Sequence, residues 1–257
     1  METTKQSYSD TFTIAWRCLL LSCRNPETFL TSILLPALMM LLFVSLFGSL
    51  IRVDGTSYTA YIVPGVLIQC AAQGSSTTAI MVNQDITSGI LSRFSTLPIR
   101  QGALLYGHVL EACARNLVTS AVVLVIALLL GFRPALTLTG LGITFLLLSG
   151  MILALSWLAV AVGILSKSAQ GASSLSSLAI VLPYLSSGFV PTEHLPPLLR
   201  TFARYQPMTP VIDAMRDALS GSPADAGTLG AALLWCALLT AVFCAASVLF
   251  LKRRLLG

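Results

Sequence analysis

The stretch SGFVPTEHLPPLLRTFARYQPMTPVIDAMRDALSG, residues Ser187–Gly221, lies between two long apolar runs. Its charged positions, from Glu193 to Asp217, would be costly against lipid. Leucine, phenylalanine, alanine, valine and methionine recur between these charges, so the stretch is not a plain solvent loop either. A half-buried insert of this kind, placed just before a last apolar run, is typical of a small set of membrane architectures.

The whole chain has the composition of an integral membrane protein. Of its 257 residues, 56% are hydrophobic and 10% are charged, and the mean hydropathy is +0.86. Soluble domains carry about 25% charged residues, so this chain lacks the polar side chains that a water-soluble surface needs. The six cysteines lie in or beside apolar runs without paired metal-ligand spacing, and we expect them to act as small hydrophobic residues rather than metal ligands.

Six apolar runs are long enough to cross a hydrocarbon core of about 30 Å, which takes about 20 helical residues. They are Phe29–Ile51, Tyr58–Met81, a third run that ends near Leu130, Leu138–Leu165, Ala172–Val190 and Thr228–Leu251. The first of them predicts an uncleaved anchor rather than a signal peptide. Residues Leu117–Gly131 alone would extend only about 22 Å, so we expect the third helix to begin earlier and to carry Arg115 near a membrane surface.

The distribution of positive charge predicts the orientation of these spans. With the N-terminus inside, ten of the 15 lysines and arginines fall on inner segments and five on outer ones. The positive-inside rule therefore predicts that both termini lie in the cytoplasm. Because the acidic residues divide equally, the net charge of +5 faces the cytoplasm, and we interpret it as a topological signal rather than as a nucleic-acid-binding surface.

Two segments predicted to lie on the inner side have amphipathic patterns. Residues 8–24, which include Arg17, suit a helix lying in the membrane interface. Residues 84–101 carry Asp85 near the expected start of a short helix, Gly89 within it and an apolar stripe at helical spacing. The stripe consists of Ile86, Ile90, Leu91 and Phe94. From its spacing alone, the stripe is equally consistent with two interpretations. It could be a surface that docks another protein, or it could belong to a helix that rests on the bilayer.

Polar residues inside the apolar runs allow two interpretations each. Glu111 and Arg115 are four residues apart, which favours an ion pair at the membrane edge; a proton relay is the alternative. Gln69 and Gln73 share a helix face and either join helices or line a weakly indicated translocation path. The Gly163–Ser168 segment lacks the glycine that a phosphate-binding loop needs before its lysine, so we predict no nucleotide site, no catalytic residue and no bound cofactor or metal in this chain.

Prolines divide residues 188–226 into two helices too short to span the membrane. Pro196 and Pro197 suit the first turn of one helix, and Pro210 suits the start of another that Gly221 could cap. We expect an extracellular re-entrant hairpin of two antiparallel helices, in which Asp213 pairs with Arg216. The residues assigned to this hairpin are Glu193, Arg200, Arg204, Gln206, Pro207, Asp213 and Arg216.

Over nearly its full length the chain resembles ABC-2-type transporter permeases, particularly the daunorubicin-resistance group of drug or lipid exporters. The resemblance rests on SGFVP at Ser187–Pro191, on the QP of Gln206–Pro207 and on AMR at Ala214–Arg216. The stretch from Asp85 through GILSRF and LPIR to His108–Arg115 is a further mark. These motifs are fairly specific for the family, but they do not identify a substrate.

The resemblance implies a single transmembrane domain over residues 1–257, which is all-helical and has six spans in the bacterial cytoplasmic membrane. It implies a second permease subunit and two copies of an ATPase that holds Mg-ATP, so that this subunit itself is no enzyme. Docking on the ATPase would fall to residues 8–24 and 84–101, and the substrate would be an amphipathic drug or lipid. An ion-coupled secondary transporter and a membrane scaffold without transport activity are the alternatives.

Overall fold

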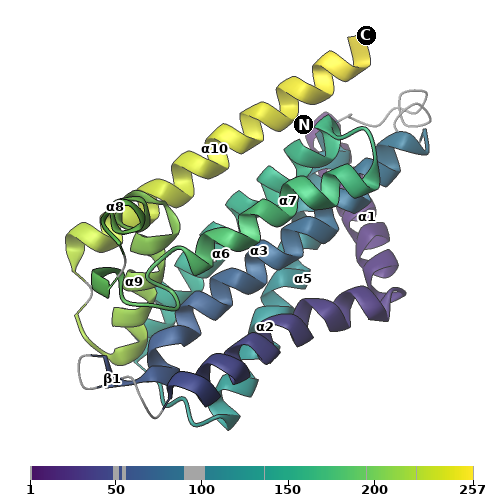
Figure 1. Ribbon diagram of the computed structural model, residues 1–257. Coiled ribbons are helices and arrows are strands. Elements are labelled where there is room, and N and C mark those ends of the chain that lie inside the picture. Colours follow the sequence, from purple (N-terminus) through teal and green to yellow (C-terminus); the bar gives the residue numbers. More distant parts are fainter. Residues whose placement is uncertain are drawn as a thin grey trace.

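The computed structural model describes residues 2–48, 52–53, 56–89, 102–135, 137–194, 196–223 and 225–256. Long helices lie side by side as a bundle (Figure 1). The helices are α1 (Glu2–Cys23), α2 (Pro26–Phe47), α3 (Tyr58–Thr87), α5 (Gly102–Leu129), α6 (Leu138–Leu165), α7 (Ala169–Tyr184), α8 (Pro197–Tyr205), α9 (Met208–Ser220) and α10 (Ala226–Leu256), with a 3-10 turn at Thr192–His194. A two-residue antiparallel ladder, β1 (Arg52–Val53) with β2 (Thr56–Ser57), departs from the all-helical prediction.

Local sequence signals set many of the helix ends. Ser57, Thr137 and Ser168 each accept a hydrogen bond from a backbone N–H in the first turn of α3, α6 and α7, which satisfies a donor that the helix itself leaves unpaired. At the other end of α9, Gly221 adopts a left-handed conformation with φ 77°. The cap at Gly221 was predicted, and so was a helix that begins at the paired prolines, which the structure shows as α8.

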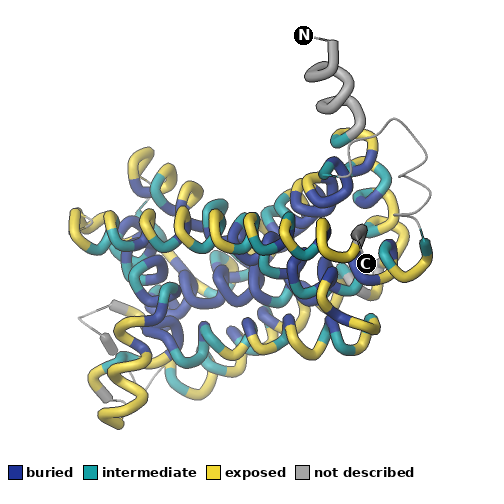
Figure 2. The backbone as a smooth tube through the Cα atoms, turned by 90° about the horizontal axis from the view of Figure 1, so that it is seen from above, coloured by how far each residue is buried: buried dark blue, intermediate teal, exposed yellow. Residues whose placement is uncertain are grey.

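Helix α3 forms the centre of the bundle. It packs against α2, α5, α6, α7 and α9, and most of its residues are buried (Figure 2). Its polar residues are therefore turned toward protein rather than lipid, as the complete burial of Gln69 and Thr78 shows. A helix enclosed in this way can carry amides and hydroxyls that would be costly on a lipid-facing helix.

Four helices in the described part of the chain are long and apolar enough to cross a membrane: Phe29–Phe47, Gly102–Leu129, Leu138–Leu165 and Ala226–Arg254. They match four of the six predicted spans, and the third does begin well before Leu117. The other two predicted spans fall on α3 and α7. Helix α3 has 30 residues but many polar ones, and α7 has only 16 residues. Six spans with both termini inside therefore stay a prediction.

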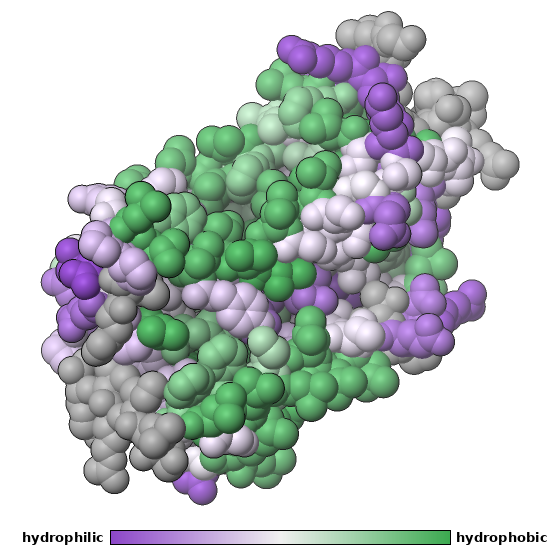
Figure 3. Space-filling view, viewed as in Figure 1, coloured by the Kyte–Doolittle hydropathy of each residue, from purple (hydrophilic) through white to green (hydrophobic). Residues whose placement is uncertain are grey.

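The bundle has two polar ends with an apolar surface between them (Figure 3). Both chain termini, α1 and the last turns of α3 and α10 lie toward one end, whereas β1, α8 and α9 lie toward the other (Figure 1). Side chains link segments within the first end, because Asn83 donates to the carbonyls of Gly163 and Ser166 at 3.1 and 2.7 Å. The described parts of the segments predicted to be cytoplasmic thus lie at one end.

The predicted start of the cytoplasmic helix at Asp85 is wrong. Helix α3 continues without a break past Met81 to Thr87, so Asp85 lies in its last turn. Gly89 follows the end of α3 with a φ of 74°, which glycine adopts readily, and is not inside a helix. The helix extends this far because Asn83 and Asp85 both find polar partners on neighbouring elements. Ile90, Leu91 and Phe94 lie outside the described residues.

Candidate functional site

The SGFVP motif lies against the first turns of α3 at the end of the bundle that carries α8 and α9. The hydroxyl groups of Tyr58 and Tyr61 donate to the carbonyls of Phe189 and Ser187, at 2.9 and 2.8 Å. At the crossing the two backbones touch, because a Cβ on Gly65 would lie 2.6 Å from the carbonyl oxygen of Gly188. The glycine in the motif therefore permits a contact that a larger residue would block.

Arg216 of α9 completes this outer cluster. Its guanidinium forms an ion pair with Asp213 at 2.6 Å and donates to the carbonyls of Ser187 and Tyr61, at 2.6 and 3.2 Å. It also lies over the Tyr61 ring, 3.9 Å from the centroid. Asp213 in turn accepts a hydrogen bond from the Ser187 hydroxyl at 2.6 Å. The predicted pair is present, and it joins α9, α3 and the SGFVP motif.

The other residues assigned to the hairpin are not brought into this cluster. Arg200 donates to the carbonyl of Glu193 on the exposed side, and Arg204 is exposed in the last turn of α8. Gln206 is buried, and Pro207 precedes α9 as its N-cap. Helix α9 packs mainly against α3, α6 and α10, and α8 is seen end-on where α9 is not (Figure 1). The expected antiparallel pair is therefore wrong.

At the opposite end, Asp85 joins three elements. Arg17 of α1 donates to both of its carboxylate oxygens, at 2.9 and 3.1 Å, and His108 of α5 contacts it at 3.1 Å through Nε2. Burial favours a raised pKa for Asp85, which lies beyond the apolar part of α3. The hydrogen bonds with His108 and Arg17 outweigh that effect and lower the pKa from 3.8 to about 2. The carboxylate is therefore ionised at neutral pH.

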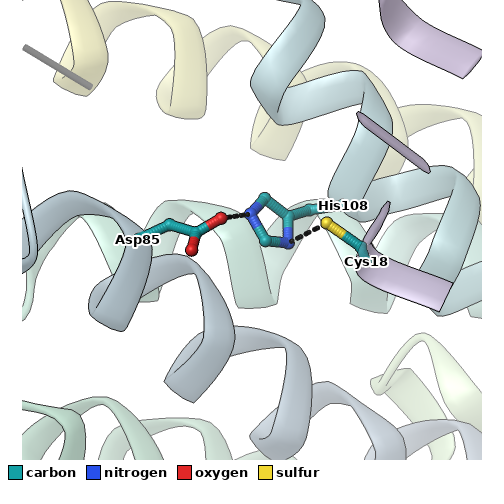
Figure 4. A group of neighbouring side chains, drawn as sticks. All are labelled: Cys18, Asp85 and His108. Atoms are coloured by element: carbon teal, nitrogen blue, oxygen red, sulfur yellow. Dashed lines mark hydrogen bonds and ion pairs between the residues drawn. The ribbon is translucent and has the colours of Figure 1, made fainter. Parts of the chain in front are cut away.

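Cys18 extends this inner cluster on the far side of the imidazole, with its Sγ 3.7 Å from His108 Nδ1 (Figure 4). Cys18, Asp85 and His108 offer possible metal-ligand atoms within 4.8 Å of one another. Arg17, however, holds both oxygens of Asp85 and would repel a cation placed there. The arrangement fits a hydrogen-bonded charge cluster that ties α1 to α3 and α5 better than it fits a metal centre.

The predicted Glu111–Arg115 pair lies in the interior, with its atoms 2.9 Å apart and side-chain exposures of 0% and 3%. Arg115 also donates to the carbonyl of Gly74 at 3.2 Å and to the Thr78 hydroxyl at 2.7 Å, and Ser22 of α1 donates to Glu111. Its role as an anchor at the membrane edge stays a prediction. The hydrogen bonds of this pair join α5 to α3 and α1.

A cavity of about 270 Å³ lies between the Asp85–His108 cluster and the Glu111–Arg115 pair. Its wall is formed by α1, α2, α3 and α5, and it includes Asp85, His108 and Arg115 together with the apolar side chains of Phe29 and Met81. The glutamines proposed for a translocation path lie elsewhere on α3. Gln69 donates to the hydroxyl of Tyr184 on α7, which supports a role in joining helices.

Comparison with known proteins gives the family of the chain. The ABC-2 type transporter family matches residues 9–220, which include both clusters. The chain belongs to the ABC-2 type transporter family. It is therefore a multi-pass permease subunit, and its ATPase partner is a separate subunit.

Two relatives of this ABC-2 permease are named for drug resistance. It is 30% identical over 236 residues to the daunorubicin resistance ABC transporter permease protein DrrB1 of Streptomyces coeruleorubidus, a match that covers 91% of this chain and 83% of the relative. It is 29% identical over 233 residues to the probable doxorubicin resistance ABC transporter permease protein DrrC of Mycobacterium tuberculosis, with 83% and 78% covered.

Sequence reasoning found the residues of the permease that pair within one helix and missed those that meet across helices. The partner of His108 on α5 is Asp85 of α3, a pair that no sequence pattern indicated. Cys18 was interpreted as a small hydrophobic residue only. One signal was available, since three ionisable residues close to the ends of apolar runs, Arg17, Asp85 and His108, need partners if they are to be buried.

Proposed function

We propose that this permease is the membrane-spanning subunit of an ATP-driven exporter that moves an amphipathic drug-like or lipid-like molecule out of the cytoplasm or the inner leaflet. The observation that carries the proposal is the extent of the similarity to DrrB1, which covers 91% of this chain. The short Arg52–Ser57 connection after α2 leaves no room at that point for a large external domain of the kind that some lipid exporters carry.

The proposed assembly contains a second permease subunit, identical or related, and two ABC ATPase subunits that hold Mg-ATP. It lies in a bacterial cytoplasmic membrane with the ATPases on the side of both permease termini. Docking on the ATPase falls to residues 8–24 and 84–101. The inner cluster supports this assignment, because Arg17 belongs to the first segment and Asp85 to the second, and the two are directly bonded.

In the proposed mechanism, closure of the ATPase dimer pushes the docking segments and rearranges the spans. A displacement of α1 would reach α3 through Arg17 and Asp85, and α5 through His108 and the hydrogen bond from Ser22 to Glu111. At the other end, Arg216 would hold α9 and the SGFVP motif against α3 until the path opens. The chain thus provides two charged groups around one cavity near the docking segments and a separate charged group at the other end.

Efflux of daunorubicin from cells that express the permease together with its ATPase tests the proposal. We expect retention of the drug to rise when the ATPase carries a substitution that abolishes ATP hydrolysis, and to stay unchanged when a protonophore collapses the ion gradient at constant ATP. Lipid export is tested in the same strains by labelling of newly made lipid from outside. Efflux that follows the ion gradient and ignores the ATPase variant would contradict the proposal.

An ion-coupled transporter is the alternative that the interior charges favour. Asp85, His108 and Arg115 line one cavity, and Glu111 is paired with Arg115 beside it, so two carboxylates lie close to one buried space. The protonophore arm of the efflux assay separates this alternative from ATP-driven export. A scaffold without transport activity would show no efflux in either arm.

A further inference from the structure

A basic hollow of about 350 Å³ lies where the end of α6 meets the last turns of α10. Its wall combines two kinds of residue. Lys167, Arg253 and Arg254 supply three positive charges, and Leu165 and Phe250 supply apolar surface. Among the residues that the structure describes, none with a carboxylate side chain lines the hollow. A surface that joins clustered cations to apolar side chains matches a molecule with an anionic head and a hydrocarbon tail.

Two of the three cations have no partner within the described part of the chain. Lys167 and Arg253 are exposed and take part in none of its ion pairs or hydrogen bonds. Arg254 donates to the carbonyl of Ile164, which fixes the last turn of α10 against the end of α6. The nearby carbonyl of Ser166 is occupied by Asn83. The hollow therefore holds free positive charge on a fixed frame.

The position of the hollow in the bundle decides which anion fits. It lies at the end of α10 that carries Arg253 and Arg254. The surface between the two polar ends of the molecule is apolar (Figure 3). Leu165 is 61% exposed and Leu249, one residue before Phe250, is 57% exposed. An acyl chain could lie along this apolar surface while the phosphate of the same molecule lies between the cations. An acidic protein surface would pair with the cations but would have no hydrocarbon chain to cover the apolar part.

We propose that the hollow formed by Leu165, Lys167, Phe250, Arg253 and Arg254 binds the headgroup of an anionic phospholipid. The site is independent of the transported substrate and of the proposed direction of transport. Each cation near a membrane surface strengthens binding of anionic lipid by about fivefold. Loss of Lys167 and Arg253 together should therefore weaken binding by about 25-fold.

Titration of phosphatidylglycerol into the purified full-length chain in a neutral detergent, with bound lipid counted by native mass spectrometry, tests the site. Phosphatidylcholine with the same acyl chains serves as the neutral lipid. We expect the wild-type chain to prefer phosphatidylglycerol and the Lys167→Gln/Arg253→Gln variant to lose that preference. The matched control is Arg24→Gln/Lys252→Gln, which removes two exposed cations outside the hollow and should change binding by less than about twofold.

Three results would overturn the proposal. The first is an equal loss of phosphatidylglycerol binding in both double variants, because binding would then depend on the net charge of the chain and not on the hollow. The second is displacement of phosphatidylglycerol by an equal concentration of inorganic phosphate, which would indicate a site for free anions. The third is an unchanged preference for phosphatidylglycerol in Lys167→Gln/Arg253→Gln. If the same variant also failed to copurify the ATPase from cells, the hollow would belong to a protein partner.

Discussion

At the scale of single residues, the interior ion pairs set the largest energetic effects. Glu111 and Arg115 are almost completely excluded from solvent, and each compensates the charge of the other. Asp213 and Arg216 are partly exposed, but Arg216 also holds two backbone carbonyls. Removal of one member of such a pair leaves a charge without compensation, and the cost rises with the degree of burial.

We expect Glu111→Gln to lower the free energy of unfolding by about 3–5 kcal/mol, because it leaves the buried guanidinium of Arg115 without its carboxylate. Thermal unfolding of the purified protein in detergent measures the change. Glu27→Gln, at an exposed position in the first turn of α2, is the control and should stay within about 0.5 kcal/mol of wild type. Glu111→Gln/Arg115→Met should recover part of the loss. A stable single variant would contradict the compensation argument.

Arg216→Ala should abolish or strongly reduce export at matched expression, because it disconnects α9 from Ser187 and Tyr61 and leaves Asp213 unpaired. We expect a loss of stability of roughly 1–3 kcal/mol from the unsatisfied groups. Arg200→Ala removes an exposed contact to a backbone carbonyl and should be mild. Equal and negligible effects of the two substitutions on drug efflux would show that the outer cluster has no part in transport.

At the scale of elements, the contacts between helices depend on residues that permit close approach or offer an apolar stripe. The crossing of α3 and the SGFVP motif needs the absence of a side chain at Gly65 and Gly188. Docking on the ATPase, as proposed for residues 84–101, would depend instead on the apolar stripe of that segment. The two features can be tested separately.

Gly65→Ala should destabilise the permease by about 1–3 kcal/mol, because the added Cβ would meet the backbone of Gly188 at 2.6–2.8 Å and backbone cannot move aside cheaply. Gly230→Ala on α10 is the matched control. No atom lies within 4 Å of a Cβ there, so the helix should gain up to about 1 kcal/mol. Thermal unfolding compares the two, and equal melting temperatures would exclude a tight crossing.

Leu91→Asp/Phe94→Asp should release the ATPase while leaving membrane insertion intact. Burial of such side chains contributes about 1.5–3 kcal/mol each before the cost of ordering them. Leu198→Asp/Phe202→Asp makes the same changes on the exposed surface of α8 at the opposite end of the bundle and should leave the complex intact. Copurification of the ATPase is the measurement, and full recovery of the ATPase with the first variant would refute the docking assignment.

At the scale of the whole molecule, the orientation in the membrane decides which cluster meets the ATPase. The two polar ends of the bundle separate the segments predicted to be inside from those predicted to be outside (Figure 1). This grouping agrees with an even number of crossings, but it does not say which end faces the cytoplasm. Positive charge decides that question only as a prediction.

Single cysteines placed at Thr56 or Asp225 should react with an impermeant reagent added to intact cells, and cysteines at Ser88 or Gly257 should not. The experiment needs a background in which all six native cysteines are replaced, since Cys23 is exposed. Permeabilised cells, in which all four positions should react, provide the control. Labelling of Gly257→Cys from outside would exclude the six-span arrangement with both termini in the cytoplasm.

Residue order alone determined what lies within one helix. The apolar runs predicted where the helices lie, the prolines and Gly221 predicted α8 and the end of α9, and spacings of three and four residues predicted the Asp213–Arg216 and Glu111–Arg115 pairs. Each of these depends on neighbours in the chain, because the geometry of a helix fixes which side chains share a face. The family motifs added the permease assignment, which the match over residues 9–220 confirms.

Only the tertiary structure decided which helix faces which. Arg17 and Asp85 are 68 positions apart and His108 follows Asp85 by 23, so no local spacing could predict their meeting. The central place of α3 was equally hidden, since Tyr58–Met81 was predicted only as one of six spans. The physical reason lies in the solvent: lipid is as apolar as the protein interior, so hydropathy marks the residues that leave water but does not tell which of them face lipid and which face protein.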